Sequence, residues 1–160
     1  YIEEQIKIVG DVKRITLSDH TPGLISKEHC EEFVIPYLNQ IFDQTNAEIT
    51  FYHNENNWNY CIPIMNTLHC DVIHAGPSLD WDQTNIYLPQ CIMGNLDPIQ
   101  ILADGNCGTI KEEIARIVKA SKRETKLLLS TGGGMHPATT EENIQCMVNE
   151  IAKKNSKIIN

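Results

Sequence analysis

Histidine and carboxylate side chains spaced as in a metal or acid–base site follow an apolar segment of the chain. His53 and Glu55 come directly after residues 48–52, which are β-branched and aromatic as in a strand. Alternate residues of an extended segment share a face, so these two side chains can point the same way. His74 ends the next apolar segment, residues 71–74. A set of His53, Glu55 and His74 with an open position would suit zinc or another divalent ion; polar lining or direct contact with a substrate is the alternative.

Two further polar pairs follow apolar segments. Asp19 and His20 could act as acid and base or orient a polar substrate, although Asp before Thr-Pro-Gly is equally typical of a turn. Asn95 and Asp97 belong to the segment Gly-Asn-Leu-Asp-Pro that ends another apolar run. We expect Asn95 to line a site and Asp97 to cap the helix that follows it.

A run of three glycines, Gly132, Gly133 and Gly134, comes two residues after the last apolar segment, residues 126–129. Glycine permits positive φ and close backbone approach, so the run could present amide hydrogens to an anionic group of a substrate. Tight packing against a strand explains three glycines equally well. Both interpretations put the run at the end of a strand.

Strand-like and helix-like segments alternate along the chain, which predicts a parallel sheet with right-handed crossovers. We expect strands at residues 12–17, 48–52, 71–74, 91–93 and 126–129, and helices at 2–8, 26–42, 58–68, 79–87, 99–103, 109–121 and from 140 onward. Five such units are too few to close an eight-stranded barrel, which typically takes about 250 residues. The expected fold is therefore α/β, either an open sheet or part of a barrel, in a single domain over residues 1–160.

Composition narrows the range of partners. The 160 residues carry a net charge of −8, which argues against binding to nucleic acid phosphates. No run of about 18 apolar residues occurs, so we expect no membrane association and a cytoplasmic protein. Six cysteines lie without C-x-x-C spacing, and we expect buried reduced thiols in preference to disulfides or metal ligands.

Several segments together resemble the uroporphyrinogen decarboxylase superfamily, which also contains the corrinoid-dependent methyltransferases. They are residues 15–19, 23–26, 33–38, 94–98, 130–134 and 142–144, and the resemblance covers nearly the whole chain. The shared fold is an eight-stranded (β/α) barrel roughly twice as long as this chain. The resemblance implies that the chain is the C-terminal portion of such a barrel, with parallel strands and outer helices.

The loops decide which chemistry the resemblance implies. Decarboxylases of the superfamily have a histidine in the glycine loop after the last strand, and residues 129–134 contain none. Thiol-alkylating methyltransferases bind zinc through a His-x-Cys pair and a second cysteine in the last loop. Here His53 matches the histidine, Glu55 replaces the first cysteine, and Gly133 or a neighbour replaces the second. A carboxylate oxygen is a harder metal ligand than a thiolate sulfur, so the site differs in donor type from the zinc site of these methyltransferases.

The resulting hypothesis is methyl transfer from a small methylated substrate, with Asp19, His53 and Glu55 as catalytic groups and His20, His74, Asn95 and the three glycines around the substrate. Zinc and a corrinoid carried by a partner protein are the implied cofactors, and the chain alone is expected to be inactive. A decarboxylase-like lyase acting on a carboxylated substrate is the first alternative. The second is a non-catalytic half-barrel that forms a homodimer or pairs with a missing N-terminal half.

Overall fold

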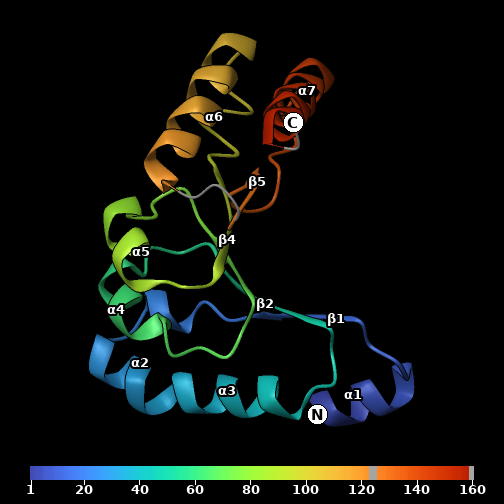
Figure 1. Ribbon diagram of the computed structural model, residues 1–160, viewed down its shortest axis with the longest axis vertical. Coiled ribbons are helices and arrows are strands. Elements are labelled where there is room, and N and C mark those ends of the chain that lie inside the picture. Colours follow the sequence, from blue (N-terminus) through green and yellow to red (C-terminus); the bar gives the residue numbers. More distant parts are fainter. Residues whose placement is uncertain (123–125, 159–160) are drawn as a thin grey trace.

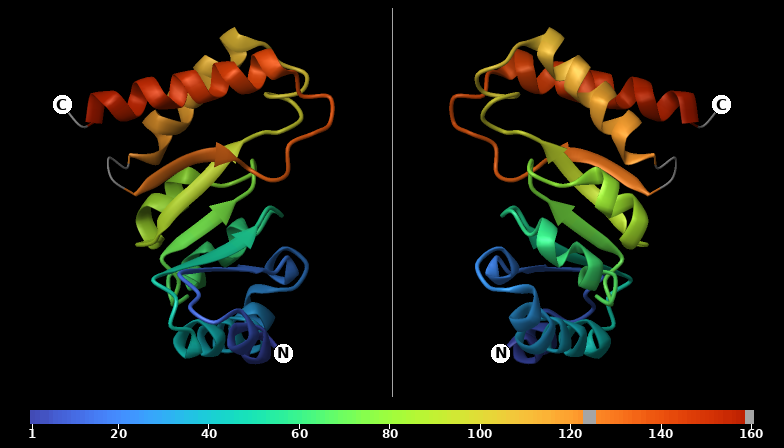
Figure 2. Two further views of the ribbon diagram at one scale, coloured as in Figure 1. Left: turned by 90° about the vertical axis from the view of Figure 1, so that its right-hand side faces the viewer. Right: turned by 90° about the vertical axis from the view of Figure 1, so that its left-hand side faces the viewer.

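The computed structural model describes residues 1–122 and 126–158, and its centre is one parallel sheet. The strands follow the order of the chain: β1 (Arg14–Ser18), β2 (Ile49–Asn54), β3 (Val72–Ala75), β4 (Cys91–Leu96) and β5 (Leu127–Thr131). All four neighbouring pairs are parallel, so the carboxyl ends of the strands lie along one edge (Figure 2). The predicted α/β fold with five strand–helix units is confirmed.

Helices cover the convex face of the curved sheet (Figure 1). They are α1 (Ile2–Val9), α2 (Lys27–Phe33), α3 (Ile35–Gln44), α4 (Ile62–Met65), α5 (Trp81–Tyr87), α6 (Cys107–Ser121) and α7 (Glu141–Ile158), with short 3-10 helices η1 (Thr21–Gly23) and η2 (Asn59–Cys61). Among the described residues, no helix combines the length and the apolar character that crossing a membrane requires.

Alternation along the strands divides the side chains between the two faces of the sheet. Tyr52, Ile73 and Ile92 are fully buried beneath the helices. Their chain neighbours lie on the opposite, concave face, where Thr16 is exposed and Leu128 is 46% exposed. This face has no covering helix among the described residues (Figure 1). The sheet is thus open in the way expected of part of a barrel.

Three predicted helices differ from the structure. Residues 26–42 form two helices, α2 and α3, which meet at Val34, because Pro36 interrupts a continuous helix. Residues 58–68 form only η2 and α4, because Pro63 restricts this segment to short helical turns. Residues 99–103 form hydrogen-bonded turns instead of a helix, although the Asp97 Oδ1 atom accepts from the Ile99 and Gln100 amides as a capping residue would. In residues 58–68 and 99–103, the spacing of apolar residues predicted longer helices than the structure contains.

Strand β4 is longer than predicted and runs through Leu96. Gly94 therefore lies within the strand, with φ of +132°, and a Cβ atom there would lie 2.6 Å from the Ala75 carbonyl oxygen. The close approach of β3 and β4 at this point requires glycine.

The prediction that all cysteines are reduced is wrong for one pair. Cys107 at the start of α6 and Cys146 in α7 form a disulfide across a sequence separation of 39 residues. Nothing in their spacing signals the bond, because it depends on the two helices packing side by side. Cys30, Cys61 and Cys70 do remain buried thiols, and burial raises the pKa of Cys70 to about 12.

Candidate functional site

Three metal-binding side chains meet at the carboxyl edge of β1 and β2. One donor atom from each of His20, His53 and Glu55 lies within 4.8 Å of the other two, and these three are the only such group of three or more among the described residues. His53 is the second-to-last residue of β2 and lies opposite Ser18, the last residue of β1, so the loop that follows β1 brings His20 to it. The geometry joins His53 and Glu55, predicted as ligands, with His20, predicted to contact substrate.

The loop after β1 is held by residues far along the chain. The Asp19 carboxylate accepts from the Thr21 amide at 2.9 Å, and the Asp19 carbonyl accepts from the Tyr52 hydroxyl at 2.8 Å. The Asn56 amide group donates to the His20 carbonyl at 3.4 Å, and the Tyr60 hydroxyl donates to the Ile25 carbonyl at 2.6 Å. Asp19 therefore shapes the turn that presents His20, and its carboxylate does not join the cluster.

Asn54 explains why His53 and Glu55 point the same way. Its fully buried side chain accepts from the Asn56 amide at 3.0 Å and donates to the Tyr52 hydroxyl at 3.2 Å. With Asn54 fixed toward the helices, the residues on either side of it face the opposite direction. The role of Asn54 was not predictable from the sequence, because a polar residue at a strand end usually faces solvent.

His74 lies behind His53 and not in the ligand cluster. The two Nδ1 atoms are 2.7 Å apart, and His74 Nε2 lies 2.8 Å from the Thr131 carbonyl oxygen. Both ring nitrogens of His74 are therefore used, which differs from its predicted role as a ligand. Burial lowers the pKa of His53, and His74 and His20 lower it further while Glu55 raises it.

The glycine run packs against the cluster. A Cβ atom on Gly133, whose φ is +155°, would collide with a carboxylate oxygen of Glu55. The Gly132 amide donates to the Leu96 carbonyl at 2.7 Å, so it is not available to a substrate anion. Gly134 has open space around its Cα atom and stands at the rim. The packing interpretation fits Gly132 and Gly133 better than anion binding does.

Asn95 is buried and holds the loop that follows β3 through side-chain hydrogen bonds. Its side chain is 1% exposed and donates at 3.3 Å to the carbonyls of Gly76 and Pro77. Pro77 in turn packs against Gly132. The structure thus places Asn95 beneath the site, where it orders the loop after β3.

A cleft of about 510 Å³ opens beside Glu55, between the loops that follow β2, β3, β4 and β5. Glu55 and Asp97 contribute carboxylates to its wall, and Ile99, Met135 and the prolines contribute apolar surface. No lysine or arginine lines it among the described residues. The cleft suits a small molecule that is neutral or cationic and partly apolar.

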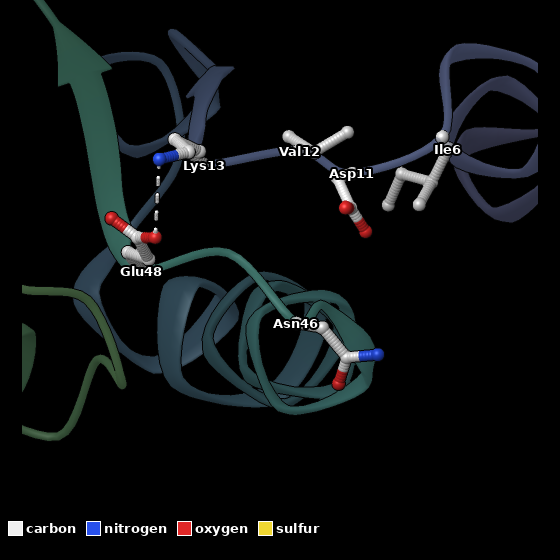
Figure 3. A pocket seen from close by; sticks show the side chains of 7 residues that line it. Ile6, Asp11, Val12, Lys13, Asn46 and Glu48 are labelled. Carbon is white, nitrogen blue, oxygen red and sulfur yellow. Dashed lines mark ion pairs between the residues drawn. The ribbon is translucent and has the colours of Figure 1, made fainter.

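A second cavity, of about 340 Å³, lies at the opposite end of the strands (Figure 3). Lys13 and Glu48, which precede β1 and β2, form an exposed ion pair of 3.8 Å in its wall. Strands of five or six residues separate this cavity from the His20–His53–Glu55 cluster by about 17 Å. We therefore place the candidate site at the carboxyl edge, where parallel sheets commonly bind ligands.

Comparison with known proteins identifies the family of this chain. The family model described as uroporphyrinogen decarboxylase (URO-D) matches residues 1–154. A uroporphyrinogen decarboxylase of Legionella pneumophila (strain Corby) is 24% identical over 94% of this chain and 43% of its own length. One from Carboxydothermus hydrogenoformans is 26% identical over 98% of this chain and 44% of its own length.

Among solved structures, a methyltransferase from Methanosarcina mazei superposes with a TM-score of 0.78 at 19% identity, covering 92% of this chain and 44% of that one. This similarity shows the shared fold. The chain spans less than half the length of the curated relatives it matches. Since the family model covers nearly all of it, the chain belongs to the uroporphyrinogen decarboxylase family.

Proposed function

We propose that this chain, as the C-terminal portion of a barrel, carries the metal-binding side of a methyl-transfer site. The observation behind the proposal is the convergence of His20, His53 and Glu55 at one strand edge. Two imidazoles and a carboxylate are a common zinc set that leaves a position open. The lowered pKa of His53 favours its neutral form, which has the lone pair that a metal requires.

Each residue has a definite task in this proposal. His20, His53 and Glu55 would hold the ion, and Gly133 keeps the space that the Glu55 carboxylate occupies. A bound zinc ion would supply Lewis acidity, which lowers the pKa of a coordinated thiol or water. The acidic, partly apolar cleft beside Glu55 would receive a small methylated molecule. A corrinoid carried by a partner protein would supply the acceptor of the methyl group, as the resemblance to the corrinoid-dependent methyltransferases implies.

Metal binding tests the proposal directly, because all three ligands lie on this chain. We expect calorimetric titration with Zn²⁺ to show about one ion per chain. His53→Ala and Glu55→Ala should each weaken binding roughly 100-fold, since either change leaves only two ligands. His29→Ala removes an exposed histidine of α2 and should leave the affinity unchanged. Unaltered Zn²⁺ affinity in both site variants would refute the proposal.

Decarboxylation is the competing function, and the names of the curated relatives favour it. The cleft argues the other way, since Glu55 and Asp97 would repel a substrate rich in carboxylates. Assays of the assembled full barrel for released carbon dioxide and for a methylated thiol product would separate the two reactions.

A binding role without catalysis has its own structural support. Strands β1 and β5 are the two edges of the sheet, and the concave face is partly exposed. Beside β5, a cleft of about 480 Å³ is lined mostly by apolar side chains, among them Leu129, Met147 and Val148 of α7. Unpaired edges and apolar surface together favour association with a second copy or with the rest of a barrel.

Sedimentation velocity over a concentration series tests this role. We expect the chain to self-associate and Val148→Asp to raise the dissociation constant at least about tenfold, because a carboxylate would replace half-exposed apolar surface at the edge. Ile86→Asp changes a residue of α5 that is 73% exposed and does not line this cleft, and it should have no effect. A monomer at every concentration would argue against the binding role.

A further inference from the structure

His53, His74 and the Thr131 carbonyl form a continuous chain of polar contacts across three strands. His74 Nε2 lies 2.8 Å from the Thr131 oxygen, and His74 Nδ1 lies 2.7 Å from His53 Nδ1. A carbonyl oxygen can only accept a hydrogen bond, so His74 must carry its proton on Nε2. The direction of the first bond is thereby determined.

The second bond follows from the first. A neutral imidazole has one N–H and one bare nitrogen, so Nδ1 of His74 is an acceptor. The proton between the two rings therefore belongs to His53 Nδ1, because two bare nitrogens at 2.7 Å would repel each other. His53, with its single proton on Nδ1, is left with a bare Nε2.

We infer that His74 is a positioning residue, which selects the tautomer and ring orientation of His53 so that Nε2 presents its lone pair to the site shared with His20 and Glu55. The inference rests on the proposed metal-binding function and adds a residue to it. Hydrogen bonds made by the distal nitrogen of a ligand histidine commonly set its tautomer and orientation.

Thr131, at the end of this chain of polar contacts (the His53–His74–Thr131 relay), is itself held by neighbouring residues. Thr131 pairs with Leu96 in the β4–β5 ladder, and its hydroxyl donates to the Gly133 carbonyl at 2.7 Å. The same short segment therefore holds His74 through its backbone and supports the glycine that packs against Glu55. The segment from Thr131 to Gly133 therefore helps to position both His53, through His74, and Glu55, through the packing of Gly133.

Two variants of His74 separate positioning from simple packing. In His74→Gln, the amide oxygen can accept from His53 while the amide nitrogen donates to Thr131, so the relay is preserved. His74→Phe keeps a ring of similar size and removes both bonds. His29→Phe, at an exposed position of α2, is the matched control.

The first readout is the ¹⁵N spectrum of the histidine rings in the metal-free chain. We expect His53 to show a protonated Nδ1 and a bare Nε2 in the wild type and in His74→Gln, and a mixture of tautomers in His74→Phe. The second readout is calorimetry with Zn²⁺ alone. His74→Phe should lose roughly 10- to 100-fold in affinity, and His74→Gln should recover most of it.

The outcomes distinguish this inference from the proposed function. A wild-type His53 protonated on Nε2, or equal Zn²⁺ affinity in all three proteins, would overturn the positioning role of His74. Absence of Zn²⁺ binding in the wild type would refute the proposed function, while the ¹⁵N spectrum would still decide the tautomer. If His74→Phe does not fold, the wild-type ¹⁵N spectrum still decides whether His53 carries its proton on Nδ1.

Discussion

Replacement of Gly133 by alanine is expected to weaken Zn²⁺ binding roughly 100-fold and to lower the free energy of unfolding by about 1 to 3 kcal/mol. The added Cβ would collide with a carboxylate oxygen of Glu55, and the positive φ of +155° adds strain for any side chain. The collision is removed at the lowest energetic cost by rotation of the flexible Glu55 side chain. This rotation moves the carboxylate away from His20 and His53. Loss of the contacts that position a metal ligand typically costs roughly 10- to 100-fold in metal affinity.

Gly134→Ala is the matched control for this prediction. It adds the same methyl group one residue further along, where nothing lies within 4 Å of the new Cβ. Calorimetric titration of both variants with Zn²⁺, alongside urea denaturation, would measure binding and stability separately. Equal binding by the two alanine variants would show that the position of Glu55 does not matter to the site.

Trp58→Ala is expected to give the largest loss of stability, about 3 to 5 kcal/mol in the free energy of unfolding. Trp58 is 2% exposed, and its indole nitrogen donates to the Asn54 carbonyl at 3.0 Å. The change leaves a cavity in the core and a buried carbonyl without this donor. Because Asn54 lies between His53 and Glu55, metal affinity should fall together with stability.

Urea denaturation followed by circular dichroism measures this loss. Tyr37→Ala, which removes an aromatic side chain of α3 that is 60% exposed, should change the free energy of unfolding by less than about 0.5 kcal/mol. A Trp58→Ala protein as stable as Tyr37→Ala would show that α4 and its neighbours contribute little to the core.

The sequence predicts the parts of this structure that depend on local pattern. Apolar segments that end in polar residues located all five strands, and alternation put His53 and Glu55 on one side of β2. Family resemblance correctly indicated the uroporphyrinogen decarboxylase family. In each case the information lies within a few neighbouring residues or in motifs that relatives share.

Features that depend on distant contacts were not predictable in the same way. His20 reaches the cluster because Tyr60 and Asn56 hold its loop from about 36 residues away. His74 became a partner of His53 only through the register of β2 with β3. The Cys107–Cys146 bond likewise requires helix packing that no spacing rule encodes.

That disulfide also decides how the chain would respond to proteolysis. Residues 134–138, which connect β5 to α7, are exposed, so a protease would reach this stretch readily. A single cut there would leave α7 covalently joined to α6 through Cys107 and Cys146. The nicked protein would migrate as one species on a denaturing gel without reductant and separate into two fragments once the bond is reduced.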